Sequence, residues 1–178
     1  MTSSLNKFGL IGFGLLMAAG ALYFLLRNDR PELYINEFMA NNSACCPNSI
    51  VQSEELADWI EIYNGGDVAV DIGGMYFSQK KLRREAFQIP KKNPSLTTIE
   101  PGGFLLLWAD GDPGRGALHV AFKLDQEGEH IGFYDEDGRT IDTITFGSQK
   151  ENVSWGRTRD GGKSWKEFVV PTPGQTNQ

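Results

Sequence analysis

Cysteine and histidine are both scarce in this chain of 178 residues, which contains two of each. The two cysteines are neighbours, Cys45 and Cys46, and adjacent cysteines can bond to each other only through a strained ring. No CxxC spacing is present to complete a zinc site. We therefore expect no ordinary disulfide and no cysteine-based metal centre, and we place Cys45 and Cys46 in a loop.

Recognisable catalytic motifs are also missing. The chain has no GxSxG, HExxH or GxxxxGK sequence. His119 and His130 lie in strand-like apolar segments, where a packing or capping role is expected, and Ser154 has no evident triad partners. The sequence therefore predicts a non-catalytic protein without a cofactor.

Positive charge is in short supply beyond residue 30. The chain has 17 Lys and Arg against 23 Asp and Glu, and the first 30 residues hold Lys7, Arg27, Arg30 and one acid, Asp29. The remaining 148 residues therefore carry a net charge of −8, and their number suits one domain. Because phosphate contacts need clustered cations, nucleic acid is not an expected partner.

One long apolar stretch is present, residues 8–26, with the sequence FGLIGFGLLMAAGALYFLL. At about 1.5 Å per residue, a helix of this length nearly spans the ~30 Å hydrocarbon core of a bilayer. We predict a short tail (1–7), a transmembrane helix (8–26), a short tether (27–32) and one folded domain (33–178). A cleaved signal peptide ending near Ala19-Gly20-Ala21 is the alternative, but the apolar run continues beyond that point.

The flanks and the small residues of the apolar stretch bear on orientation and packing. Lys7 on one side nearly balances Arg27 and Arg30 on the other, and the signal-like sequence favours a domain on the periplasmic side of a bacterial inner membrane. Small residues at spacings of four and three allow close packing against other membrane helices. The small residues on that helix face are Gly14, Ala18 and Ala21.

Beyond residue 30 the pattern is that of short strands separated by turn residues, with no long helical period. Asp137-Gly138, between two apolar-alternating runs, predicts a β-hairpin. Many short strands at this spacing predict an all-β, two-sheet sandwich of the immunoglobulin type. The predicted strands are 33–39, 59–64, 68–71, 75–78, 104–109, 130–135, 140–145 and 153–157.

A series of strings in this region resembles the lamin-tail domain family. They are INEFMANN (35–42), DWIEIYN (58–64), VDIGGMYFS (70–78), IEPGGFLLLWAD (99–110), LHVAFKL (118–124), GEHIGFYDEDGRTIDTITF (128–146), VSWGR (153–157) and PTPGQTN (171–177). The resemblance implies an immunoglobulin-like sandwich, and in bacteria it implies a non-catalytic module of exported and surface proteins.

The strand 58–64 and the end of the chain carry specific packing expectations. Trp59, Ile60, Ile62 and Tyr63 are expected to point into the core, with Asp58, Glu61 and Asn64 at the surface or at turns. Pro171 and Pro173 are expected to hold the last segment extended along the domain edge.

Carboxylates are dense enough to raise the question of a metal site. Asp135-Glu136-Asp137-Gly138 resembles part of a calcium loop but lacks the later ligands, so a hairpin tip is the expected structure. Glu37, Asp58 and Glu61 would converge if the first two strands pair, and they form the one metal arrangement to check.

Two groups of residues are candidates for binding a partner. The first is a cluster of cations that is either a solvated loop or a docking surface for an acidic partner or lipid headgroups. Its members are Lys80, Lys81, Arg83, Arg84, Lys91 and Lys92. The second is Trp155, Arg157 and Trp165, because interfaces favour Trp and Arg; Trp155 is alternatively a core residue.

Two function classes follow. The first is a membrane-anchored structural subunit that holds other membrane protein subunits together in the lipid bilayer, for example in a photosynthetic reaction-centre–antenna complex. The alternative is an independent envelope-anchored module that recognises a surface protein, a polysaccharide or calcium. The chromatin role of nuclear lamins is disfavoured because the domain is acidic and lacks a coiled-coil rod.

Overall fold

The computed structural model describes residues 31–44, 56–80 and 85–178. Contacts divide the chain into two units, Met1–Arg30 and Pro31–Gln178, and the described residues all belong to the second. Its elements are β1 (Leu33–Met39), β2 (Asp58–Asn64), β3 (Val70–Asp71), β4 (Tyr76–Ser78), β5 (Phe87–Gln88), α2 (Pro94–Thr97), β6 (Thr98–Ile99), β7 (Phe104–Ala109), η2 (Pro113–Arg115), β8 (His130–Tyr134), β9 (Thr140–Thr145), β10 (Ser154–Arg157) and β11 (Trp165–Phe168).

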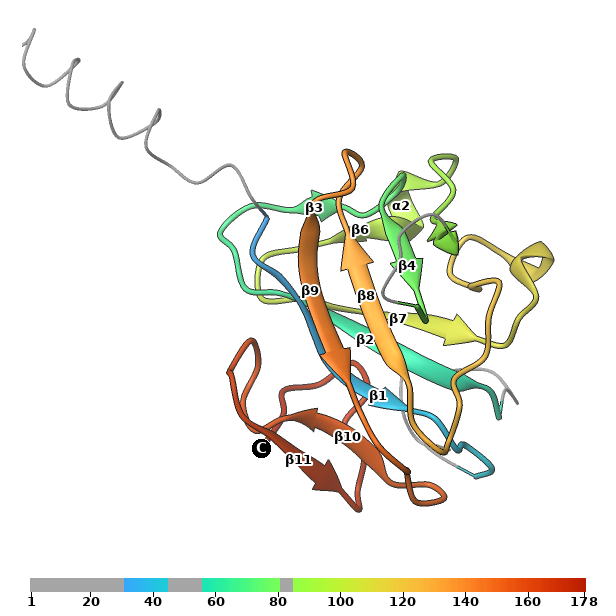
Figure 1. The fold of residues 1–178 in the computed structure, drawn as a ribbon. Coiled ribbons are helices and arrows are strands. Elements are labelled where there is room, and N and C mark those ends of the chain that lie inside the picture. The colour runs from blue at the N-terminus through green and yellow to red at the C-terminus, as the bar shows by residue number, and fades with distance from the viewer. Residues whose placement is uncertain (1–30, 45–55, 81–84) are drawn as a thin grey trace, which may run out of the picture. The chain divides into compact units, whose positions relative to one another are not determined.

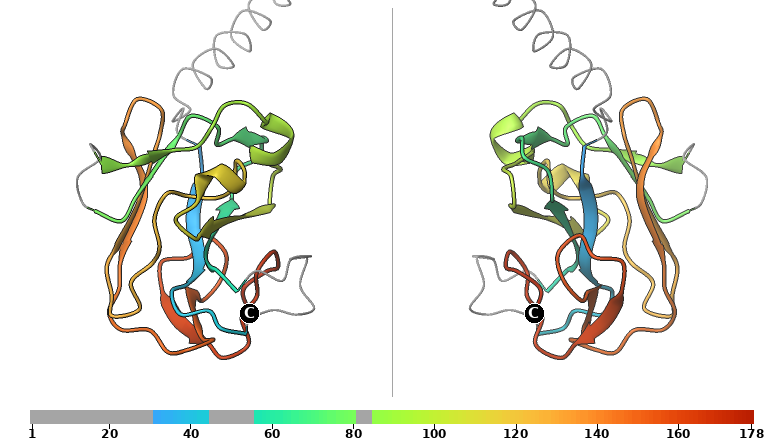
Figure 2. Two further views of the ribbon diagram at one scale, coloured as in Figure 1. Left: turned by 90° about the vertical axis from the view of Figure 1, so that its right-hand side faces the viewer. Right: turned by 90° about the vertical axis from the view of Figure 1, so that its left-hand side faces the viewer.

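The strands form an all-β fold of antiparallel sheets, consistent with an immunoglobulin-like sandwich (Figure 1). One sheet has the order β11-β10-β1-β2-β7, and a second has the order β5-β4-β8-β9. Figure 2 shows β8 and β9, in orange, in a separate layer from β1, in blue. A small ribbon of β3 and β6, which the two-sheet prediction did not include, pairs Val70 with Ile99.

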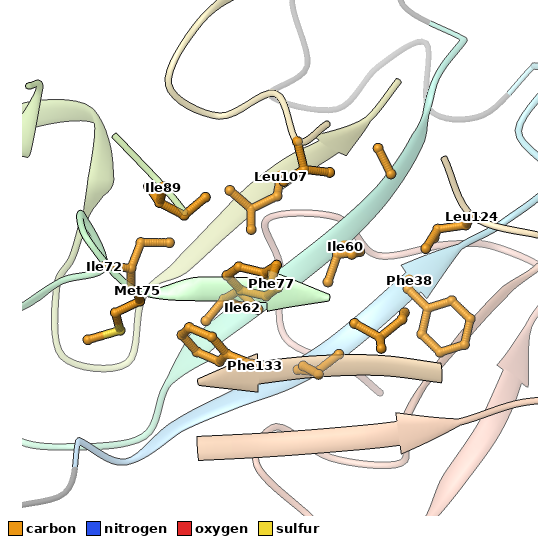
Figure 3. Packing of buried hydrophobic residues seen from close by; sticks show 14 of the residues in the cluster. Phe38, Ile60, Ile62, Ile72, Met75, Phe77, Ile89, Leu107, Leu124 and Phe133 are labelled. Carbon is orange, nitrogen blue, oxygen red and sulfur yellow. The ribbon is translucent and has the colours of Figure 1, made fainter. Parts of the chain in front are cut away.

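The hydrophobic core lies between the two larger sheets and follows from alternation along their strands. Ile60 and Ile62 of β2 are fully buried in it, together with Phe38 of β1. Phe77 of β4 and Phe133 of β8 occupy paired positions, and their rings stack with centroids 4.3 Å apart (Figure 3). Large aromatic side chains buried from both sheets supply most of the packing that holds a sandwich together.

Strand β1 contains a β-bulge at Asn36. Its pairing with β2 shifts register between Ile35 and Glu37, which leaves Asn36 as the extra residue. A bulge of this kind re-aims side chains locally. The consequence is that Glu37 pairs directly with Glu61 of β2.

The Asp137-Gly138 prediction is confirmed. Gly138 has a φ of 82° and closes the hairpin that joins β8 to β9, with its amide donating to the carbonyl of Asp135 at 2.9 Å. Glycine suits this position because a side chain is strained at a positive φ.

The predicted strands all appear, with small shifts at their ends; β3 is the most shortened, to Val70–Asp71 from the predicted 68–71. The short elements β5, β6, β11, α2 and η2 were not predicted. The expected surface or turn position of Glu61 is wrong, since its side chain is fully buried in the middle of β2. Asn64 is also fully buried, but it lies at the end of β2, at the turn where its Oδ1 accepts a hydrogen bond from the amide of Gly66. Within the described ranges no helix is long and apolar enough to cross a membrane, and the predicted span 8–26 lies outside them.

Candidate functional site

The predicted basic cluster is only partly within the described residues. Lys81, Arg83 and Arg84 lie outside them. Lys80 is exposed and forms an ion pair with Glu85, and Lys91 is exposed and pairs with Glu136.

Lys92 is also exposed. The positive charges of Lys80 and Lys91 are therefore offset by acidic neighbours of the same domain. Exposed pairs of this kind contribute little to folding, typically below about 1 kcal/mol.

The two candidate tryptophans line the margin of the core. Trp155 of β10 pairs with Phe38 of β1, and both Trp155 and Trp165 are half-buried against the core. Trp165 of β11 lies with its ring centroid 6.1 Å from that of Phe38. Both residues thus contribute to packing, with part of each ring left at the surface.

Arg157 is buried and does not have the exposure expected of an interface residue. Its Nη2 lies 2.6 Å from Asp142 Oδ2, its Nε donates to the carbonyl of Ile35 at 2.8 Å, and its Nη1 donates to the carbonyl of Gly162. Its guanidinium also stacks over Trp165, 4.8 Å from the ring centroid. All three nitrogens are therefore committed to the fold.

The three carboxylates considered for a metal do not converge. Glu37 and Glu61 lie opposite each other, but Asp58 pairs with Ala109 at the beginning of β2 and accepts a hydrogen bond from the amide of Asn42 at 3.2 Å. Asp58 and Glu61 also project to opposite faces of β2, because side chains alternate along a strand. Among the described residues no group of three His, Cys, Asp or Glu is arranged to hold a metal ion.

Instead, the two buried glutamates hold the C-terminal strap, which we define as residues 171–177. Thr172 donates to Glu37 through its amide, 3.1 Å from Oε1, and through its hydroxyl, 2.6 Å from Oε2. The amide of Gly174 donates to Glu61 Oε2 at 2.6 Å. The strap therefore crosses β1 and β2, whereas the sequence predicted that it lies along the domain edge.

Asn177 fixes the far end of the strap. Its side-chain amide donates to the carbonyl of Arg157 at 2.8 Å and to that of Asn36 at 3.3 Å, and its backbone amide donates to Asp160 Oδ1 at 3.0 Å. Asn36 in turn donates to both Glu61 and Asp160 at 3.0 Å. We call Asn36, Glu37, Glu61, Arg157 and Asp160 the strap-binding residues.

Burial dominates the electrostatics of the two glutamates. It raises the pKa of the Glu37 carboxyl, against the lowering effect of hydrogen bonds from Ser154 and Thr172. It raises the pKa of Glu61 to about 8, with a smaller contribution from the nearby Glu37 charge. A carboxyl group moved away from water favours its neutral form. Burial therefore favours the neutral form of Glu61, while the hydrogen bonds from Asn36 and Gly174 favour the charged form.

The histidines make the kind of contacts expected for packing or capping. His119 Nδ1 lies 2.7 Å from Asp110 Oδ2, and Arg115 Nη1 approaches the same oxygen at 2.9 Å. His130 Nδ1 lies 3.0 Å from the hydroxyl of Thr145 on the neighbouring strand.

Two adjoining hollows lie at the rim where β2 begins and β7 ends. They measure about 390 and 500 Å³ and share Asp58 and Lys123 in their walls. The first also contains Asp110 and Arg115, and the second contains Asn42 and Asp125. Their walls are mainly polar and of mixed charge, which suits a hydrophilic ligand better than an apolar one.

The strap contacts are what sequence reasoning missed. The sequence marks residues 171–177 only as extended and rich in proline. The predicted helix-packing residues are a separate case, since Gly14, Ala18 and Ala21 lie outside the described residues. A usable signal was the pattern Thr-Pro-Gly at 172–174, because Pro followed by Gly favours a type II turn that can present backbone amides.

The chain belongs to the lamin tail domain family, whose model matches residues 27–148. The match covers more than half of the chain and includes β1 to β9, whereas β10, β11 and the strap follow it. A comparison with curated proteins found no match.

Proposed function

We propose that this chain is a non-catalytic assembly subunit, tethered to a bacterial inner membrane by residues 8–26, whose lamin tail domain holds neighbouring membrane protein subunits on the periplasmic side. The observation that supports this most directly is the hydrogen bonding of the buried polar groups. Within the described part of the chain, every buried side-chain nitrogen and oxygen has a hydrogen-bond partner inside the domain. The buried side chains that resemble catalytic groups are therefore used to stabilise the fold. They are Arg157, Glu37, Glu61 and Ser154.

The remaining surface offers candidates for partner contact. Val169 and Val170 are adjacent and each 78% exposed, and Trp155 and Trp165 are half-buried nearby in sequence. Exposed apolar and aromatic side chains are typical anchors of protein interfaces. The proposal extends to any membrane complex, with the photosynthetic reaction-centre–antenna complex as one example.

The test is purification of the full-length tagged chain in a mild detergent, followed by mass spectrometry of the co-purifying proteins. We expect a stoichiometric set of membrane subunits, and absorbance of the same sample would reveal pigment. The variant with Val169 and Val170 both changed to Asp should lose these subunits, whereas the control Thr143→Asp, at an exposed site on β9, should retain them. Recovery of a lone chain under these conditions would contradict the assembly role.

A second function is favoured by the two polar hollows at Asp58 and Lys123. An envelope-anchored binding module would use them for a hydrophilic ligand such as a polysaccharide segment. Oligosaccharides and calcium can be tested separately by the shift in melting temperature of the purified chain. A shift caused by an oligosaccharide that is lost in Lys123→Ala would support this function.

A further inference from the structure

The conformation of the C-terminal strap is fixed by hydrogen bonds between its own residues. The carbonyl of Thr172 accepts a hydrogen bond from the amide of Gln175 at 3.0 Å, with Pro173 and Gly174 between them and Gly174 at a φ of 73°. These are the features of a type II turn, with Pro second and Gly third. The Thr172 hydroxyl oxygen also lies 2.9 Å from Asn177 Oδ1 within the strap. The strap therefore keeps its form without help from the residues that precede it.

The strap is joined to the sandwich by side-chain contacts and not by a strand ladder. Its amides and side chains bond to the strap-binding residues on β1, β2, β10 and the loop after β10. Between β11 and the chain end, the contact is from Lys166 Nζ to the carbonyl of Gln178 at 2.7 Å. None of the bonds to the strap-binding residues depends on which copy of the chain supplies the strap.

The connection between β11 and the strap has the character of a hinge. It consists of Val169 and Val170, which lie outside the strands and are each 78% exposed. The backbone bends at both valines before Pro171, and in this bent form the strap returns to its own domain. The two exposed valines leave apolar surface uncovered in a copy that closes on itself.

We propose that the strap is exchanged between two copies of this chain, so that residues 171–177 of one copy bind the strap-binding residues of the other. The polar contacts are the same whether a strap binds its own copy (the closed form) or another copy (the exchanged form). The equilibrium between the two forms therefore depends on the hinge and on the local concentration of the chain. In the exchanged form the two hinges run past each other and their valines cover one another. This inference rests on the proposed function, because a shared membrane raises the effective concentration of copies.

Hinge length provides a test that leaves the strap and the strap-binding residues unchanged. Two full-length copies with different affinity tags are co-expressed and purified in mild detergent through one tag. Deleting Val169 and Val170 prevents a strap from reaching its own domain, and inserting six Gly and Ser residues there makes self-closure easy. We expect at least tenfold more co-captured partner copy for the shortened hinge than for the lengthened hinge. Equal capture by the two would overturn the proposal.

A strap deletion separates this contact from association through residues 8–26. A copy lacking residues 171–178 retains all the strap-binding residues and should be captured by an intact copy but not by another deleted copy. Capture of one deleted copy by another, at the level of the intact pair, would overturn the proposal. Because a deleted copy exposes Glu37 and Glu61, Gly174→Ala is used in parallel: it disfavours the turn while every other residue remains, and should reduce capture in the same way.

Eluates of the intact chain and of the lengthened-hinge copy, which both retain Val169 and Val170, distinguish failure of strap exchange from failure of the assembly role. Loss of self-capture with other membrane subunits still present would overturn the exchange alone. Absence of those subunits, with hinge-dependent self-capture retained, would count against the assembly role and leave the exchange supported.

Discussion

Glu37 and Glu61 occupy directly paired positions on β1 and β2, and both side chains are fully buried. Two carboxylates this close and this far from water are costly to keep charged together, so burial raises the pKa of both. The donors that reach them come from the C-terminal strap, from Ser154 and from Asn36. The attachment of the strap and the ionisation of the pair are consequently linked.

The first prediction is that the domain loses stability as pH rises towards 8. Glu61 has a folded-state pKa of about 8 against an ordinary value of 4.5, so the folded state binds more protons than the unfolded state between these values. The stabilisation that comes from neutral Glu61 is therefore fully present below pH 4.5. Between pH 4.5 and about 8 the free energy of unfolding falls by up to about 1.4 kcal/mol per pH unit. Urea unfolding at several pH values, followed by tryptophan fluorescence, measures the slope.

Glu61→Gln is the matched variant for this prediction. The amide cannot ionise, so the fall with pH should be much smaller, although one hydrogen bond to a donor is lost. Glu127→Gln, at an exposed position, should leave the slope unchanged. A flat profile for the unaltered chain would show that Glu61 titrates normally.

The second prediction concerns the ion pair that joins the two larger sheets. Asp142 of β9 accepts from Arg157 of β10 and also from the amide of Ile35 at 2.9 Å, beside the bulge in β1. Arg157→Met should cost about 3 to 5 kcal/mol, because it leaves a largely buried carboxylate without its cation. The comparison is Lys150→Met, whose exposed pair with Glu167 predicts a loss of less than about 1 kcal/mol. Equal losses would mean that the Arg157 pair is not buried in solution.

The predictable part of this fold is the part that depends on neighbours in sequence. The hairpin at Asp137-Gly138 and the strands β1, β2, β7 and β9 follow from turn residues and apolar alternation. The elements β5, β6 and β11 are two to four residues long. Such short runs carry too little periodicity to be recognised.

The candidate site was less predictable because it joins residues that are far apart in the chain. Because side chains alternate along a strand, Glu61 lies on the side of β2 opposite Ile60 and Ile62. That side becomes buried only because Gly174, 113 positions later, crosses it. Similarly, the high interface frequency of Arg suggested that Arg157 is exposed, whereas its partner Asp142 is 15 positions earlier on the other sheet.

The third prediction tests the close approach of the backbone at Gly128. This residue has a φ of 112°, and a Cβ atom there would lie 2.6 Å from the carbonyl oxygen of Phe146. Gly128→Ala should cost roughly 1 to 3 kcal/mol from backbone strain, with more from the clash. Gly147→Ala, where a Cβ meets nothing within 4 Å, is the control and should be neutral. The melting temperature of Gly128→Ala should be clearly below that of Gly147→Ala. Similar melting temperatures for the two variants would contradict the close approach of the backbone at Gly128.

The fourth prediction is that Asn177 holds the strap in place. Asn177→Ala removes the donors to the carbonyls of Arg157 and Asn36, and leaves buried acceptors without these partners. The expected loss is about 1 to 3 kcal/mol, with faster hydrogen exchange at the amides of Thr172 and Gly174. Gln175→Ala changes an exposed side chain of the same strap and should stay within about 0.5 kcal/mol. If exchange at Thr172 and Gly174 is unchanged in Asn177→Ala, the glutamates alone are sufficient to hold the strap.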